Sequence, residues 1–275
     1  MARLRYLEFA KAGFALTVMA AGRLPAQIDY RNLDDERPLF SEDAYPIERH
    51  AFEFLLPYRF EKEADGERVH ASVLELGYGV FDNAQLGVHV PFAARSHDGE
   101  TAFGLAGVQP FLLYNFNTES RLLPALALRA DVSLPLGPLG GDGTRTTLRA
   151  IATRSWGLTR LHVNALRSFG PERGLSVAEP ARRWTWSAAI DRTILRRSLL
   201  LGGEIVASRA IAGAPVEVNV GVGARWQRTP TVVLDFGLSR RLRATGPDLG
   251  VTFGMTHAFA LRSLMPRGPH QGASQ

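Results

Sequence analysis

Residues 216–227, VEVNVGVGARWQ, carry an apolar residue at every second position: four valines, an alanine and a tryptophan alternate with Glu, Asn, Gly, Gly, Arg and Gln. A period of two puts the apolar side chains on one face of an extended strand, whereas a helix needs spacings of three and four. The same alternation occurs in residues 52–61 (FEFLLPYRFE), 85–92 and 232–239. The chain is therefore predicted to be all-β from about residue 50 onward.

Strand length indicates which kind of all-β fold this is. Ordinary globular strands have about five or six residues, and a tilted membrane-spanning strand needs about 9–11. Twelve segments, most of them about 11–15 residues long, are predicted near 50–63, 68–80, 83–95, 104–117, 124–136, 144–156, 159–169, 182–195, 199–210, 214–228, 231–243 and 248–261. Their length favours a transmembrane antiparallel up-and-down β-barrel of about twelve strands.

The predicted connections alternate in length along the chain. Short turns near 81–83, 157–158, 196–198 and 229–230 alternate with longer loops near 96–103, 135–143 and 170–181. Short turns at one end and long loops at the other are typical of outer-membrane barrels. An even number of strands then puts both ends of the barrel domain at the short-turn, periplasmic side.

The membrane dictates which way the side chains face. In lipid every backbone amide needs a partner, so the strands must close, with large apolar residues outward and polar residues inward. Val220→Arg on the outward row is expected to cost about 2–4 kcal/mol, and the inward Gly221→Ser far less. Aromatic residues that suit the membrane interfaces are Tyr58, Phe60, Phe92, Tyr114, Phe116, Trp156, Trp226 and Phe259.

Charged residues and one histidine occupy the predicted inward positions. These lumen-lining candidates are Glu53, Arg59, Glu75, His89, Arg129, Asp131, Arg149, Arg183, Asp191, Glu204, Glu217, Arg225, Asp235 and Arg241. Two interpretations stay open. The charges line a lumen that selects solutes, or they form ion-paired struts that fill the interior, because twelve strands lie between the filled and the water-filled sizes of barrel.

The N-terminus is predicted to be a signal peptide over residues 1–26. Arg3, Arg5 and Lys11 precede the apolar stretch 14–22 (FALTVMAAG), which is too short to span a membrane, and Ala26 ends a possible cleavage site. The alternative is an amphipathic first helix of a cytoplasmic protein.

Residues 27–49 form an acidic lead-in segment before the barrel. They carry seven acidic residues, three arginines and two prolines without periodicity. A flexible linker is the favoured interpretation, and a plug or a periplasmic handle is the alternative. The barrel is expected over residues 50–261, and residues 262–275 form a C-terminal tail.

Catalytic and metal chemistry find little support. The chain has no Cys, which excludes disulfides, thiolate metal sites and a cysteine nucleophile. His162, Asn164 and Ser168 share an inward strand face, but alternate residues rise about 6.5–7 Å, too far for short side chains to bond. The chain is therefore not expected to be an enzyme or to use a cofactor or metal. Lysine occurs only twice, so nucleic acid is not an expected partner.

Several of these segments resemble one outer-membrane family. They are ERHAFEFLLPYRFEKEADGERVHASVLELGYGVFDNAQLGVHVPF (48–92), GVQPFLLYNFN (107–117), LPALALRADVSLPLG (123–137), WQRTPTVVLDFGLSRRL (226–242) and GVTFGMTHAF (250–259). The chain resembles the transporter-like barrels filed under the meta-pathway of phenol degradation. The resemblance implies uptake of small, including aromatic, molecules, and it carries no catalytic residues. Such barrels usually end at an aromatic residue similar to Phe259, whereas this chain continues to Gln275.

The expected function is an outer-membrane channel or transporter that passes small solutes, including aromatic or hydrophobic compounds, by passive diffusion. The expected location is the cell outer membrane. Its expected partners are outer-membrane lipid, the barrel-assembly machinery and the small-molecule solutes. The alternatives are a closed structural or surface-interaction barrel without transport, and a soluble periplasmic β-sandwich that binds a ligand.

Overall fold

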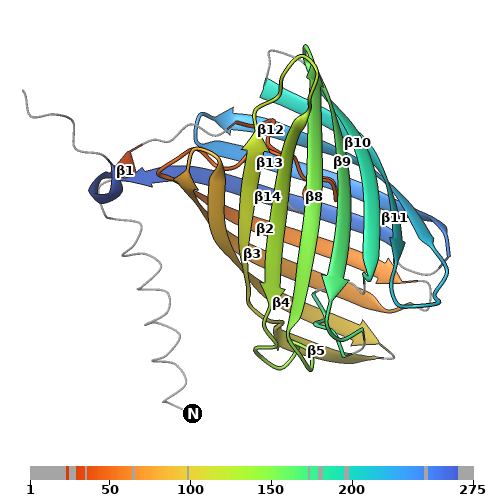
Figure 1. The fold of residues 1–275 in the computed structure, drawn as a ribbon. Helices are drawn as coiled ribbons and strands as arrows, with labels where there is room; N and C mark the ends of the chain where they lie inside the picture. The colour runs from red at the N-terminus through yellow and green to blue at the C-terminus, as the bar shows by residue number, and fades with distance from the viewer. Residues whose placement is uncertain are drawn as a thin grey trace, which may run out of the picture.

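The computed structural model describes residues 23–24, 29–34, 36–63, 66–97, 99–172, 174–178, 182–194, 198–244 and 247–265. They form one antiparallel sheet that curls into a barrel (Figure 1). Its strands are β2 (Ala51–Glu63), β3 (Arg68–Phe81), β4 (Ala84–His97), β5 (Glu100–Leu105), β6 (Gln109–Asn117), β7 (Ala125–Ser133), β8 (Arg145–Trp156), β9 (Thr159–Phe169), β10 (Trp184–Ile194), β11 (Leu199–Arg209), β12 (Glu217–Thr229), β13 (Val232–Arg243) and β14 (Pro247–Leu261).

The last strand closes the barrel onto the first. β14 pairs antiparallel with β2 from Pro247 opposite Glu63 to Ala260 opposite Ala51. Within the described residues every other strand pairs with its neighbours in sequence, and β5 and β6 together complete one position beside β4. The prediction of a closed twelve-strand antiparallel barrel is confirmed. The alternative of a two-layered β-sandwich is wrong, because the sheet has no second layer.

The hairpin after β4 differs from the prediction. Residues 96–103 were expected to be a loop, but β4 runs to His97 and β5 begins at Glu100. The predicted strand 104–117 is broken at Gly107, whose φ of 111° is favourable only for glycine. β5 therefore pairs with the long-loop end of β4, and β6 pairs with its other half. The β4–β5 hairpin therefore extends into residues 96–103 by main-chain pairing, although these residues lack an alternating apolar pattern.

Large apolar side chains cover the outside of the barrel. Trp186, Ile190, Val222 and Phe253 are each more than half exposed, whereas charged and amide side chains of the same strands are buried inside. A water-soluble protein buries its apolar residues and exposes its charges. The inverted pattern is that of a barrel surrounded by lipid.

Only parts of the predicted end segments fall within the described residues. Arg23 and Leu24 form the short strand β1, which pairs with the end of β14. The rest of the predicted signal peptide lies outside the described residues. Residues 262–264 of the predicted tail form a short 3-10 helix, η1 (Arg262–Leu264), and residues 266–275 also lie outside. No described helix is long and apolar enough to cross a membrane.

The acidic lead-in lies inside the barrel. We call residues 29–34 and 36–50 the inner segment; it is coloured red to orange in Figure 1. Leu33, Leu39, Ser41 and Ala44 in this segment are all at most 2 % exposed. The prediction of a flexible linker is therefore wrong. The segment is polar, but wall side chains satisfy its main chain, so it can be buried without forming helix or strand.

Candidate functional site: a charged lumen with an inner segment

The fourteen lumen-lining candidates fall into two groups. Eight are almost inaccessible to solvent inside the barrel: Glu53, Glu75, His89, Arg129, Arg149, Asp191, Arg225 and Asp235. Arg59, Asp131 and Glu204 also contact charged or polar groups of the interior. The remaining three lie at the long-loop end, where Glu217 lines a cavity, Arg183 pairs with Glu172 and Arg241 pairs with Asp248.

Side chains of the wall hold the main chain of the inner segment. The Glu204 carboxylate accepts hydrogen bonds from the backbone N–H groups of Phe40 (2.7 Å) and Ser41 (3.0 Å). The Asn164 amide makes two bonds to Glu42, accepting from its N–H (2.9 Å) and donating to its carbonyl oxygen (2.9 Å). These contacts satisfy backbone groups that a strand would have satisfied by pairing.

The same arrangement continues toward β2. Thr153 accepts from the N–H of Ala44 (3.0 Å), and Asn115 donates to the Ala44 carbonyl oxygen (2.7 Å). Gln85 then accepts from the N–H of Ile47 (2.7 Å). We call Gln85, Asn115, Thr153, Asn164 and Glu204 the polar wall.

The polar wall fixes the path of the inner segment. Its members lie on β4, β6, β8, β9 and β11, and they contact the segment in reverse strand order from Phe40 to Ile47. The segment therefore runs across the strands, around the inside of the barrel. Glu204 was predicted to face inward, but its partner could not be predicted, because a polar residue on a strand does not reveal what it faces.

Two acidic side chains of the inner segment meet three arginines of the wall. Glu42 pairs with Arg129 (2.8 Å) and Arg149 (3.2 Å), and Asp43 pairs with Arg160 (3.1 Å). All five side chains are at most 5 % exposed. Charge-assisted hydrogen bonds of this kind are stronger than neutral ones. Arg160 was missed as a candidate, although it has the same inward parity as His162.

The adjoining part of the wall, on β11 to β14, accommodates the inner segment through glycines that lack side chains. A Cβ atom added at Gly237 would overlap the backbone carbonyl oxygen of Pro38, and one at Gly223 would lie 2.8 Å from the Pro38 side chain. A Cβ at Gly202 would lie 2.8 Å from Leu39, and one at Gly254 would overlap the Arg37 guanidinium. We call Gly202, Gly223, Gly237 and Gly254, on β11 to β14, the glycine wall.

Within the part of the chain that the structure describes, these contacts bury many of the lumen-facing side chains at the level of the inner segment. Arg129 and Arg225 on the wall are 1 % exposed, and His162 is not exposed at all. A water-filled channel would leave such lumen-facing side chains accessible. Ion-paired struts occupy this level of the interior, and several of the partners of the wall charges are supplied by the inner segment.

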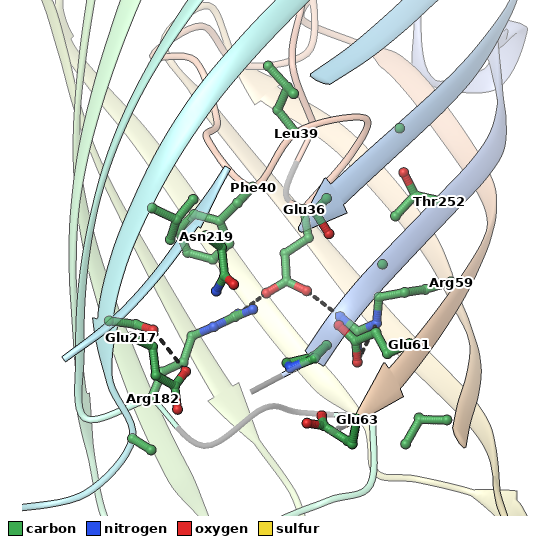
Figure 2. Close-up of a pocket in the computed structure, with 18 of the residues that line it drawn as sticks. Glu36, Leu39, Phe40, Arg59, Glu61, Glu63, Arg182, Glu217, Asn219 and Thr252 are labelled. Atoms are coloured by element: carbon green, nitrogen blue, oxygen red, sulfur yellow. Dashed lines mark hydrogen bonds and ion pairs between the residues drawn. The ribbon is translucent and has the colours of Figure 1, made fainter. Parts of the chain in front are cut away.

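A cavity of about 530 Å³ opens toward the long loops. We call it the vestibule. Its floor includes Pro38, Leu39 and Phe40 of the inner segment. Figure 2 shows Glu36 of the segment between two arginines: its carboxylate pairs with Arg59 of β2 (2.6 Å) and with Arg182, just before β10. The inner segment thus links two separate parts of the barrel at the base of the vestibule.

The lining of the vestibule is acidic. Among the described residues it includes seven glutamates, Glu36, Glu61, Glu63, Glu67, Glu172, Glu204 and Glu217, and three arginines, Arg59, Arg95 and Arg182, so its formal charge is −4. At its rim, the Ala212 N–H and the Arg183 guanidinium lower the pKa of the Glu172 carboxyl. Negative charge at the entrance of a pore favours cations over anions.

A long loop narrows the lumen beside the vestibule. Ala178, which follows β9, packs against Ala71, Ala93 and Ala106 of the β3–β5 region. The Ala178 carbonyl oxygen accepts a hydrogen bond from Arg59 (2.6 Å). The loop therefore reaches across the interior, and the predicted external loop 170–181 lies partly inside the barrel.

One buried chain of polar groups has the order found in some hydrolases. Thr153 contacts His162 Nδ1 (3.1 Å), and His162 Nε2 contacts Asp191 (2.9 Å). A nucleophile needs room for a substrate, but Thr153 and His162 are not exposed at all, and Thr153 already bonds the inner segment. We therefore interpret the Thr153–His162–Asp191 series of hydrogen bonds as structural. Among the described residues no group of three or more His, Asp or Glu side chains could hold a metal ion.

No protein-family model matches the chain, and no curated protein matches it in sequence. Solved structures do match. The COG4313 outer membrane channel from Pseudomonas putida F1 is 14 % identical with a TM-score of 0.57, covering 79 % of this chain and 98 % of that one. The KdgM porin is 13 % identical with a TM-score of 0.52, covering 74 % and 98 %; it has also been solved with disordered oligogalacturonate.

These similarities define the class of fold. The chain shares the closed-barrel fold of the KdgM porin and of the COG4313 outer membrane channel, and this likeness is one of structure. The particular family expected from the sequence segments is not established by this similarity.

Proposed function

We propose that the protein is an outer-membrane channel for small solutes and that displacement of the inner segment opens it. The observation that carries this proposal is the combination of a lipid-facing barrel, a vestibule of about 530 Å³ and a floor made by the inner segment. The floor is removable because the closing β14–β2 pairing lies wholly within residues 51–260 and does not involve the inner segment.

The charge of the vestibule supports a solute class. Because the described lining carries a formal charge of −4, we expect neutral or cationic solutes, aromatic and hydrophobic ones among them, to enter more readily than anions. Passage is by passive diffusion, and the proposed location is the cell outer membrane.

Planar-bilayer conductance of the refolded full chain tests the proposal. The wild-type chain is expected to stay closed for long periods. The Gly237→Ala chain, in which the added methyl overlaps the Pro38 carbonyl, should open at least tenfold more often and prefer cations. The matched control is Gly203→Ala, whose Cβ would have 3.7 Å to its nearest neighbour.

The filled interior also favours a second candidate, a closed barrel with a structural or surface-interaction role. The two candidates differ in the Gly237→Ala chain. Silence of that variant, in protein that shows heat-modifiable gel migration, would contradict the channel and support the closed barrel.

A further inference from the structure

The contacts between the wall and the inner segment separate into two kinds, and each kind indicates a ligand. The first kind is made to main-chain N–H and carbonyl groups, which every peptide has. Within residues 40–47, the N–H groups of Phe40, Ser41, Glu42, Ala44 and Ile47 all donate to wall side chains. Main-chain contacts of this kind give affinity for an extended peptide, and side-chain contacts give specificity.

The second kind is made to acidic side chains. Arg129 and Arg149 together hold the Glu42 carboxylate, and Arg160 holds that of Asp43. Arg129 and Arg160 are themselves placed by wall carboxylates, since Asp131 accepts from Arg129 (2.9 Å) and Asp191 from Arg160 (2.8 Å). The guanidinium groups are therefore held in place by residues of the barrel, ready to receive two successive acidic side chains.

The barrel does not need the inner segment for its own strand pairing. The hydrogen bonds and ion pairs described above that join residues 36–47 to the wall use wall side chains, and the nearest isolated bridge to a strand is between Arg49 and Gly79. An occupant held in this way is exchangeable, unlike a strand of the barrel.

From these observations we infer that the polar wall, with Arg129, Arg149 and Arg160, is a binding site for extended acidic peptides, and that residues 36–47 are its resident occupant. A peptide supplied in trans binds there when the resident segment is weakened. Since the vestibule lining carries a formal charge of −4, the acidic peptide enters from the short-turn end. This site does not require the barrel to conduct, so it can be tested separately from the channel.

The test uses the full chain with Glu42→Gln and Asp43→Asn, folded in detergent, and a fluorescent peptide with the sequence of residues 36–47, ERPLFSEDAYPI. Fluorescence anisotropy is expected to show saturable binding. The same peptide carrying Glu42→Gln and Asp43→Asn should bind at least tenfold more weakly. The wild-type chain should also bind the acidic peptide at least tenfold more weakly, because its tethered segment competes at high effective concentration.

Wall variants then locate the site. Adding Asn164→Leu should weaken binding of the acidic peptide at least tenfold, whereas Arg192→Gln, on the exposed side of β10, should leave it unchanged. If the doubly neutralised chain does not fold, the Gly237→Ala chain replaces it. No saturable binding, or equal binding of the acidic and the neutralised peptide, would overturn the inference. Conductance of the same variants without peptide reports on the channel alone.

Discussion

Two adjoining parts of the barrel wall hold the same segment in contrasting ways. The polar wall, on β4 to β11, supplies hydrogen-bonding side chains to the backbone of residues 40–47. The glycine wall, on β11 to β14, supplies space for residues 37–39 because it has no side chains. Substitutions in the polar wall should therefore release the segment by removing hydrogen-bonding atoms. Substitutions in the glycine wall should release it by adding atoms that overlap the segment.

The largest effect is expected from the charges that the polar side encloses. Glu42→Gln leaves Arg129 and Arg149 without the segment's carboxylate, and breaking a buried ion pair costs about 3–5 kcal/mol. Chymotrypsin cleavage after Phe40 in the folded barrel should become at least about a hundredfold faster. Glu172→Gln, at the exposed long-loop end, is the control and should leave the rate unchanged. Equal cleavage rates in wild type and Glu42→Gln would mean that these pairs do not hold the segment.

The next effect comes from the glycine wall. Gly237→Ala forces overlap with the Pro38 carbonyl, and overpacking of this kind costs about 1–3 kcal/mol. Cleavage after Phe40 should accelerate by about 5- to 150-fold. Gly203→Ala, which has room for its methyl group, should not change the rate. If the two alanine variants behave alike, the glycine wall has no role in docking.

A single hydrogen bond of the polar wall should matter less. Thr153→Val keeps the shape but removes the acceptor for the Ala44 N–H, together with the contact to His162 Nδ1, and leaving the Ala44 N–H unsatisfied costs about 1–2 kcal/mol. We expect cleavage after Phe40 to accelerate by about 5- to 30-fold. Thr146→Val, at an outward position of the same strand, serves as the control. If Thr153→Val accelerated cleavage more than Glu42→Gln does, the hydrogen bonds of the polar wall would contribute more to docking than the buried ion pairs, contrary to this prediction.

The smallest effect is expected where the inner segment is exposed. Arg31 pairs with Asp29 at 2.9 Å, with both side chains more than a third exposed. Exposed pairs contribute about 0–1 kcal/mol. Arg31→Ala should change the cleavage rate less than about fivefold. A larger acceleration would show that docking depends on the start of the segment as well as on its two walls.

The barrel itself could be predicted from the sequence, because strand periodicity and length are local. The outward row that includes Val222 and Trp226 is exposed, and its inward neighbour Arg225 is buried. The path of the inner segment could not be predicted, because its partners lie far away in sequence, as with Glu42 and Arg129. The expected mildness of Gly221→Ser stays a prediction: a Cβ there would lie 3.0 Å from the Glu204 carboxylate that holds Phe40, so that carboxylate would have to shift by a few tenths of an ångström.

The signals that could have revealed the inner segment were present but indirect. Inward glycines recur at Gly202, Gly223, Gly237 and Gly254, and a strand interior normally gains nothing from glycine unless another backbone approaches closely. The lead-in carries acidic residues, whereas the arginines lie on the strands of the wall. Neither pattern specifies which residues meet, and that depends on the closure of the barrel.

Thiol labelling of one position tests most directly whether the inner segment occupies the lumen. The chain has no cysteine, so a single thiol can be introduced by Ser41→Cys, a substitution that changes the size of the side chain little. Ser41 is not exposed, and its hydroxyl bonds Ser187 and Glu204. In the folded barrel this thiol should react at least about a hundredfold more slowly than that of Leu122→Cys on an exposed turn. After unfolding, both should react alike. Equal rates in the folded protein would contradict an inner segment held in the lumen.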